Sequence, residues 1–242
     1  MDAIRTQGLV KRYGDVVAVD GLSLCVTQGE IYSLLGVNGA GKTTTIKMLS
    51  CLSAPTEGDA WLLGKSIRTQ AGEIKAQIAV SPQETAVAPG LTVRENLALM
   101  CGIYGFDKQK RVAAITELVA LLGLDGVLDK KAGKLSGGWQ RRLSIAMALI
   151  GEPKILFLDE PTLGLDVIAR SELWEIIRAL KSKATVILTT HYMEEAEALS
   201  DRIAIMKDGK LLICDTPDAL KQATQTNSIE QAFIQIVKGV SL

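Results

Sequence analysis

The segment from Gly36 to Thr43 carries residues whose types and spacing suit the binding of a polyphosphate. It reads Gly36-Val37-Asn38-Gly39-Ala40-Gly41-Lys42-Thr43 and satisfies the pattern G-x-x-x-x-G-K-[ST] at every fixed position. Its glycines let backbone N–H groups converge on phosphate oxygens, and a following helix directs its positive end at the same anion. Lys42 adds a charge near the β- and γ-phosphates, and Thr43 offers a hydroxyl to Mg²⁺.

The flanks of this loop decide against the alternative, a glycine-rich turn that matches the pattern by accident. The apolar run 31–35 predicts a buried strand before the loop, and 43–50, which includes Thr44, predicts a helix after it. Strand, loop and helix in this order are the context that the motif requires. The sequence therefore predicts a triphosphate site.

Two adjacent carboxylates, Asp159 and Glu160, end the apolar run 155–158. Charges at the end of a buried strand need a partner, and in phosphate-loop proteins the first carboxylate binds Mg²⁺. Glu160 then remains free to face the γ-phosphate and orient a water molecule. The alternative is a strand that simply runs out into solvent.

Four further positions have weaker signals, and each has an ordinary alternative. Gln83 and His191 follow predicted strands, at the edge where open α/β sheets bind ligands. Gln83 is equally well a surface residue, and the lone His191 a structural one rather than a phosphate sensor. Ser136-Gly137-Gly138 opens a helix and suits an anion, but also a plain helix cap. Tyr13 is placed either to stack on a purine base or merely to face solvent.

Composition limits the remaining possibilities. The chain has 242 residues, of which 48% are hydrophobic, so it can bury a large core. Lys plus Arg and Asp plus Glu number 27 each, which gives no overall positive charge to attract nucleic acid. No signal peptide or membrane span is predicted, so we expect a soluble, cytoplasmic chain. Four scattered cysteines predict reduced and mostly buried thiols: Cys25, Cys51, Cys101 and Cys214.

Element patterns predict one domain with an insertion. Short strand signals fill the first part of the chain and resume after residue 150, while 91–150 reads as helical, beginning at the capping box Thr92-Val93-Arg94-Glu95. We expect a single domain over 1–242, with a core formed by 1–90 and 151–215, a helical subdomain over 91–150, and a short helical tail over 216–242.

With these motifs assembled in order, the sequence from Arg5 to about Asp215 resembles the ATP-binding cassette family, the ATP-hydrolysing subunits of membrane transporters. The resemblance is specific because independent motifs coincide in the family's order: Tyr13, the loop Gly36 to Thr43, Gln83, the signature Leu135-Ser136-Gly137-Gly138, Asp159-Glu160, Gly164-Leu165-Asp166, and His191. Stretches such as Pro82-Gln83-Glu84 look similar to bacterial exporters of drugs, antibiotics or sodium.

The resemblance implies an α/β fold: a phosphate-loop NTPase (RecA-like) core, an N-terminal antiparallel β subdomain and an inserted helical subdomain. It implies catalytic roles for Glu160, His191 and Gln83, and magnesium ligation by Thr43, Gln83 and Asp159. Nucleotide contacts are implied for the following residues: Tyr13, Gly36, Asn38, Gly39, Ala40, Gly41, Lys42, Thr43, Thr44, Ser136, Gly137, Gly138 and Asp166.

The implied partners are a separate membrane permease and a second ATP-binding subunit, identical or different, in a head-to-tail dimer around ATP and Mg²⁺. The chain would then lie at the inner face of the cell membrane. Trp139 departs from the family, which usually has glutamine there, and this puts the sugar-side contact or dimer docking in question. A soluble cassette ATPase of DNA repair or ribosomes, and a small-molecule kinase, are the alternatives. The first of these usually carries a long coiled-coil insertion or two cassettes, and neither appears in this sequence. Glu160 directly after Asp159 and the signature Ser136-Gly137-Gly138 speak against the kinase.

Overall fold

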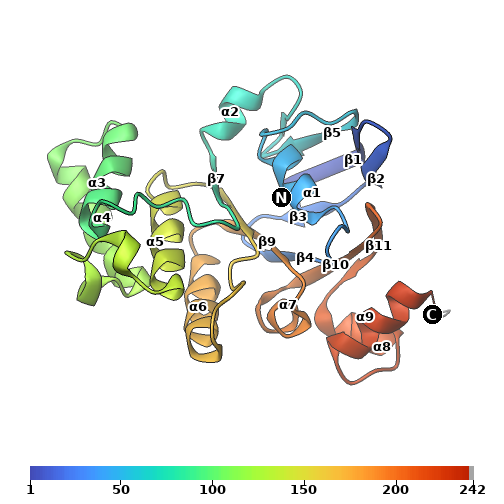
Figure 1. Cartoon of the computed structure of the whole chain (residues 1–242). Coiled ribbons are helices and arrows are strands. Elements are labelled where there is room, and N and C mark those ends of the chain that lie inside the picture. Colours follow the sequence, from blue (N-terminus) through green and yellow to red (C-terminus); the bar gives the residue numbers. More distant parts are fainter. Residues whose placement is uncertain (240–242) are drawn as a thin grey trace.

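The structure, a computed structural model, describes residues 1–239 (Figure 1). Its strands are β1 (Asp2–Tyr13), β2 (Val16–Leu22), β3 (Cys25–Thr27), β4 (Ile31–Leu35), β5 (Glu57–Leu62), β6 (Lys65–Ser66), β7 (Ile78–Ser81), β8 (Ile155–Asp159), β9 (Thr185–Thr190), β10 (Arg202–Lys207) and β11 (Lys210–Asp215). Its α-helices are α1 (Lys42–Leu49), α2 (Ala71–Lys75), α3 (Val93–Ile103), α4 (Lys108–Leu122), α5 (Gly137–Leu149), α6 (Val167–Leu180), α7 (Met193–Leu199), α8 (Pro217–Ala223) and α9 (Ile229–Lys238). Two short 3₁₀ turns are η1 (Asp125–Val127) and η2 (Ala132–Lys134).

A six-stranded sheet in the order β11-β10-β4-β9-β8-β7 forms the centre of the molecule. Its strands are parallel except β11, which pairs with β10 as an antiparallel hairpin. The register sets Leu35 of β4 beside Thr190 of β9, and Asp159 of β8 beside Thr189. The carboxyl ends of β4, β8 and β9 therefore meet at one edge, which is where open α/β sheets bind ligands.

A second, antiparallel sheet is built from the N-terminal part of the chain. Strands β2, β1, β5 and β6 follow one another in that order, and β3 also pairs with β1. An apolar core joins this sheet to α1 and the central sheet, with Ile4, Tyr32 and Phe157 among its fully buried members. The predicted α/β fold with an N-terminal antiparallel sheet is confirmed.

Residues 91–150 form only helices and turns, apart from one isolated bridge between Thr92 and Lys131. Helix α3 begins at the predicted capping box, in which Thr92 and Glu95 satisfy each other's backbone N–H groups. Figure 1 shows α3 and α4 at one end of the molecule, with α5 between them and the central sheet. A continuous apolar cluster links this segment to the sheet through α5 and α6, but its treatment as a separate subdomain stays a prediction.

The segment after β11 forms α8 and α9, which pack on α7 through Ala196, Leu220 and Phe233. The predicted tail reached residue 242, and 240–242 lie outside the described residues. All four cysteines are free, as expected. The prediction that they are mostly buried was wrong: only Cys101 is buried, and Cys25 is exposed because it lies on the short strand β3.

Candidate nucleotide-binding site

The loop between β4 and α1 is shaped by glycines at positions where no other residue fits. A Cβ atom at Gly36 would lie 2.6 Å from the carbonyl oxygen of Met206, and one at Gly41 would lie 2.5 Å from that of Ala18. Gly41 also has a φ of +98°, a conformation that L side chains rarely adopt. The neighbouring strands β10 and β2 therefore press directly on this loop and fix its path.

Backbone N–H groups accumulate at the end of this loop without protein acceptors. Within residues 1–239, no protein acceptor takes the N–H groups of the following residues: Asn38, Gly39, Gly41, Lys42, Thr43 and Thr44. Ala40 is an exception, since its N–H donates to the carbonyl of Val37 at 3.1 Å. Helix α1 starts here with no acidic residue in its first turn, so its positive end is not neutralised. These groups together form a cradle for an anion.

Three charged or titratable side chains converge beside this cradle. Nζ of Lys42 donates to the carbonyl oxygens of Gly36 (2.8 Å) and Val37 (3.2 Å), and it lies 3.6 Å from Oε1 of Glu160. The same Oε1 lies 3.3 Å from Nδ1 of His191, although the two do not form a hydrogen bond. Burial lowers the pKa of Lys42, and the Glu160 carboxylate opposes that effect. The three predicted residues thus meet at one point: Lys42 from the start of α1, and Glu160 and His191 from the ends of β8 and β9.

Glu160 sits on strained backbone. Its φ is +47°, in the left-handed region that a non-glycine residue rarely occupies, and its side chain is buried. The backbone N–H of Glu160 bonds to Oγ1 of Thr189 at 3.0 Å and to the carbonyl of the same residue at 3.2 Å. Such strain persists only where the surroundings enforce it, and it is concentrated at functional sites.

The buried Asp159 carboxylate is hydrogen-bonded to two hydroxyl groups beside the cradle. Oδ1 accepts hydrogen bonds from Oγ1 of Thr43 (3.1 Å) and Oγ1 of Thr189 (2.5 Å). Hydroxyl and carboxylate oxygens are the ligands that Mg²⁺ takes, usually with one or two carboxylates, phosphate oxygens and water. Thr43 and Asp159 therefore fit such an ion. Groups of three or more acidic, cysteine or histidine side chains that could hold a metal are absent from residues 1–239, so phosphate oxygens would have to complete the shell.

Thr189 belongs to this site but was not predicted. It joins Asp159 to the backbone of Glu160, and its hydroxyl is fully buried. The available signal was a hydroxyl residue within an otherwise apolar strand, two positions before His191.

The signature segment begins helix α5 with an unused hydroxyl. Ser136 is at the N-cap position, but its side chain makes no capping hydrogen bond and is exposed. This weakens the interpretation of Ser136 as a plain cap. Gly138 approaches α6 so closely that a Cβ atom would lie 3.2 Å from Cβ of Ala169. Helix α5 lies apart from α1 in Figure 1, so the signature is not brought to the phosphate loop of the same chain.

Three further predicted residues form no hydrogen bond to the cradle within residues 1–239: Gln83, Tyr13 and Asp166. Gln83 follows β7 with an exposed side chain, and among residues 1–239 no hydrogen bond joins its amide to Thr43 or Asp159. The ring of Tyr13, about half exposed, lies 5.0 Å from Nζ of Lys11. Asp166 caps α6 by accepting from the N–H of Ala169 at 2.9 Å. Nucleotide contacts by these residues stay predictions.

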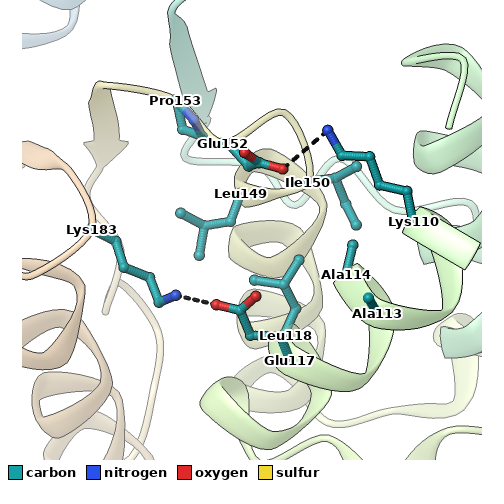
Figure 2. A pocket seen from close by; sticks show the side chains of 10 residues that line it. All are labelled: Lys110, Ala113, Ala114, Glu117, Leu118, Leu149, Ile150, Glu152, Pro153 and Lys183. Carbon is teal, nitrogen blue, oxygen red and sulfur yellow. Dashed lines mark hydrogen bonds and ion pairs between the residues drawn. The ribbon is translucent and has the colours of Figure 1, made fainter.

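A hollow of about 360 Å³ lies elsewhere, between α4 and the end of α5 (Figure 2). Its walls are the apolar side chains of Leu118, Leu149 and Ile150, and ion pairs of Lys110 with Glu152 and of Lys183 with Glu117 cross it. None of the predicted nucleotide or metal residues lines it. The hollow and the cradle are thus separate features of the molecule.

Comparison with known proteins agrees with this geometry. A family model described as ABC transporter matches residues 19–163. The chain belongs to the ABC transporter family. Nod factor export ATP-binding protein I of Burkholderia orbicola (strain AU 1054) is 44% identical over 87% of this chain and 69% of its own length. Daunorubicin resistance ATP-binding protein DrrA2 of Streptomyces coeruleorubidus is 41% identical over 94% and 71%.

Solved structures give the same result for the fold. An ATP-binding subunit of an ABC transporter superposes with a TM-score of 0.85 at 26% identity, covering 97% of this chain and 99% of that one. The ATP-binding cassette MJ0796, solved as a dimer bound to ADP and Pi in a post-hydrolysis state, gives 0.78 at 26% identity over 88% and 98%. This chain is thus an ABC transporter ATPase, and the interpretations as a DNA-repair or ribosomal ATPase or as a small-molecule kinase lose their support.

Proposed function

We propose that this chain binds MgATP, hydrolyses it within a dimer of ATP-binding subunits, and drives a separate membrane permease that exports its substrate. The observation that carries the proposal is the convergence of Lys42, Glu160 and His191 beside a cradle of free N–H groups. This convergence places a carboxylate that can act on water next to a cradle suited to phosphate.

Binding would rest on the cradle. The free N–H groups at the start of α1 and the Lys42 ammonium would hold the β- and γ-phosphates through charge-assisted hydrogen bonds. Thr43 and Asp159 would hold Mg²⁺, which when bound offsets phosphate charge and polarises phosphate oxygens. Tyr13 would stack on the base from the end of β1.

Hydrolysis would rest on Glu160. Its carboxylate is buried and its backbone is fixed by two bonds to Thr189, so its oxygens can orient a water molecule and accept its proton. His191, 3.3 Å from the same carboxylate oxygen, would contact the γ-phosphate as it separates. Gln83 would approach from the end of β7 and complete the magnesium site.

Dimerisation would supply the missing side of the site. Ser136 and Gly137 are exposed at the start of α5, a helix that lies apart from α1 in Figure 1, so they suit the nucleotide held by a second subunit, identical or different. The solved cassette MJ0796 is dimeric, which supports this arrangement. ATP would hold the dimer together through contacts to its γ-phosphate, and hydrolysis would release it.

The names of the relatives support coupling to a permease. Both curated relatives described above are named as export or resistance ATP-binding proteins. In residues 1–239, no helix is long and apolar enough to cross a membrane. A separate permease would therefore provide the path, with this chain at the cytoplasmic face of the membrane.

The test is a phosphate-release assay on the purified chain, followed by purification of the tagged chain from native membranes in mild detergent. We expect Mg²⁺-dependent ATP hydrolysis and recovery of an integral-membrane protein in stoichiometric amount. Absence of hydrolysis by both the isolated chain and its membrane complex would refute the ATPase proposal. Hydrolysis without any membrane partner would refute the proposed transport role.

A further inference from the structure

Arg141 lies on the second turn of α5 and is buried, with 4% of its surface exposed. Its guanidinium makes no ion pair among residues 1–239. Instead, Nη1 donates to the carbonyl oxygen of Pro82 at 2.6 Å, and Nη2 donates to that of Gln83. A planar guanidinium that bridges two consecutive carbonyl oxygens fixes the orientation of both peptide groups. The backbone that carries the Gln83 amide is thus held by the signature helix.

A second hydrogen bond joins α5 to the strand β7 itself, before the Gln83 loop begins. Ser144, one turn after Arg141 on the same helix face, shares a buried hydrogen bond of 3.1 Å with Ser81, the last residue of β7. Among residues 1–239, strand β7 pairs with β8 alone and forms the edge of the central sheet. Its end is therefore held from one side by the sheet and from the other by α5.

Burial of an unpaired charge is unfavourable, so the position of Arg141 needs a physical reason. Burial lowers the pKa of this guanidinium, and the charges of Asp159 and Glu195 oppose that effect. The hydrogen bonds to the carbonyl oxygens of Pro82 and Gln83 replace part of the hydration that the buried guanidinium loses. They act on the loop of Gln83, on the side of the site where Mg²⁺ is expected.

We propose that Arg141 is a positioning residue for the magnesium site: it fixes the backbone from which Gln83 presents its amide, and it makes the Gln83 loop and the signature helix α5 move as one unit. This inference rests on the proposed function. Because Ser136 is the N-cap of α5, a nucleotide bound in one subunit would bias the signature that acts on the nucleotide of the other. Such coupling is reciprocal.

The test compares three variants of the whole chain. Arg141→Met keeps most of the aliphatic volume and removes every donor. Arg141→Lys keeps the charge but cannot bridge two carbonyl oxygens in a plane. Ser144→Ala is the matched control, since it removes a hydrogen bond between the same helix and strand without touching the Gln83 loop.

The main readout is the Mg²⁺ concentration that gives half of the maximal ATPase rate. We expect Arg141→Met to raise it roughly 10-fold, the effect typical of losing a residue that orients a metal ligand. Arg141→Lys should fall between this variant and the parent, and Ser144→Ala should match the parent. Combined with Gln83→Ala, Arg141→Met should add no further shift, because the two residues act in one chain of contacts.

A second readout does not depend on hydrolysis. The thermal stabilisation by a non-hydrolysable ATP analogue should require more Mg²⁺ in Arg141→Met, while the stabilisation in EDTA should equal that of the parent. If Arg141→Met fails to fold, Arg141→Lys carries the same comparison.

Two results would overturn the proposal: an equal shift in Ser144→Ala, or an undiminished shift when Arg141→Met is added to Gln83→Ala. A parent chain that neither hydrolyses ATP nor is stabilised by the analogue would instead refute the proposed function itself, and it would do so before any variant is compared.

Discussion

Nζ of Lys42 and Oε1 of Glu160 lie 3.6 Å apart, and both side chains are almost completely buried. Burial lowers the pKa of Lys42, and the Glu160 carboxylate at this distance opposes that effect. The ammonium is also held by the carbonyl oxygens of Gly36 and Val37. A γ-phosphate bound in the cradle would compete with Glu160 for the same cation, so we expect phosphate binding to weaken the contact between Lys42 and Glu160.

Replacement of Lys42 tests the phosphate site. Lys42→Ala should lower the ATPase rate by about 100- to 1,000-fold, the usual effect of removing one preorganised electrostatic contact, and it should weaken MgATP binding. Lys47→Ala is the matched control, because Lys47 lies on the same helix but is exposed. Phosphate release and isothermal titration measure both effects. A rate within a few-fold of the parent would refute the assignment of the loop.

Two substitutions at the start of α5 test two separate points. One tests whether the signature lies against the partner's nucleotide, and the other tests whether hydrolysis depends on the residue type at position 139. Ser136→Arg should stop hydrolysis, because a long side chain at this exposed position would block the partner's nucleotide. Trp139→Gln restores the usual family residue and should leave hydrolysis measurable. Arg142 lies 4.8 Å above the Trp139 ring, so this second change should also lower the free energy of unfolding by about 0.5–1 kcal/mol.

ATPase assays and urea unfolding of the two variants give these results. Abolished hydrolysis in Trp139→Gln together with parental hydrolysis in Ser136→Arg would show that the signature does not act on the partner's nucleotide.

A pH-dependent stability is expected from Glu195, a fully buried carboxyl on α7. Oε1 accepts a hydrogen bond from the indole N–H of Trp174 at 3.2 Å, while burial raises the pKa of Glu195 above its ordinary value. Since the folded state then holds the proton more tightly than the unfolded state, the parent loses stability as the pH rises through the raised pKa. Glu195→Gln cannot ionise and should lack this loss.

The difference in unfolding free energy between Glu195→Gln and the parent should therefore shift in favour of the variant from acidic to alkaline pH. Urea unfolding at a series of pH values measures it. Glu194→Gln, an exposed neighbour on the same helix, should show no such trend. A constant difference across the series would mean that Glu195 has the same pKa in both states.

Local patterns predicted the parts of the site that are contiguous in sequence. The phosphate loop, the Asp159-Glu160 pair and the capping box of α3 each lie within one short segment, so their residue types identify them. Contacts over long sequence separations were not predicted. Thr189 meets Asp159 across 30 residues, and Arg141 meets Gln83 across 58.

The strand order was also beyond the sequence patterns. Strand β4 lies between β10 and β9. The sequence does not predict this order, because five parallel strands can be ordered in many ways with the same hydrophobic pattern. The burial of the cysteines was misjudged for a related reason: the average tendency of cysteine to be buried says nothing about the edge position of β3.

Glu160→Gln should separate nucleotide binding from hydrolysis. The amide keeps the shape of the side chain but loses the charge, so it can no longer accept a proton from water. The substitution also frees Lys42 from its carboxylate partner, and the ammonium becomes fully available to the γ-phosphate. We therefore expect ATP to bind at least as tightly as in the parent while hydrolysis nearly stops, and the ATP-bound dimer should accumulate.

Size-exclusion chromatography with MgATP should show this dimer with retained, unhydrolysed ATP, whereas the parent under turnover should elute mainly as a monomer. Glu152→Gln is the control for the loss of one negative charge, since Glu152 is exposed and pairs with Lys110 beside the hollow of Figure 2. Hydrolysis at the parental rate would remove Glu160 from the mechanism. An inactive variant that stays monomeric with bound ATP would leave Glu160 as the catalytic carboxylate. It would indicate that dimerisation requires the permease.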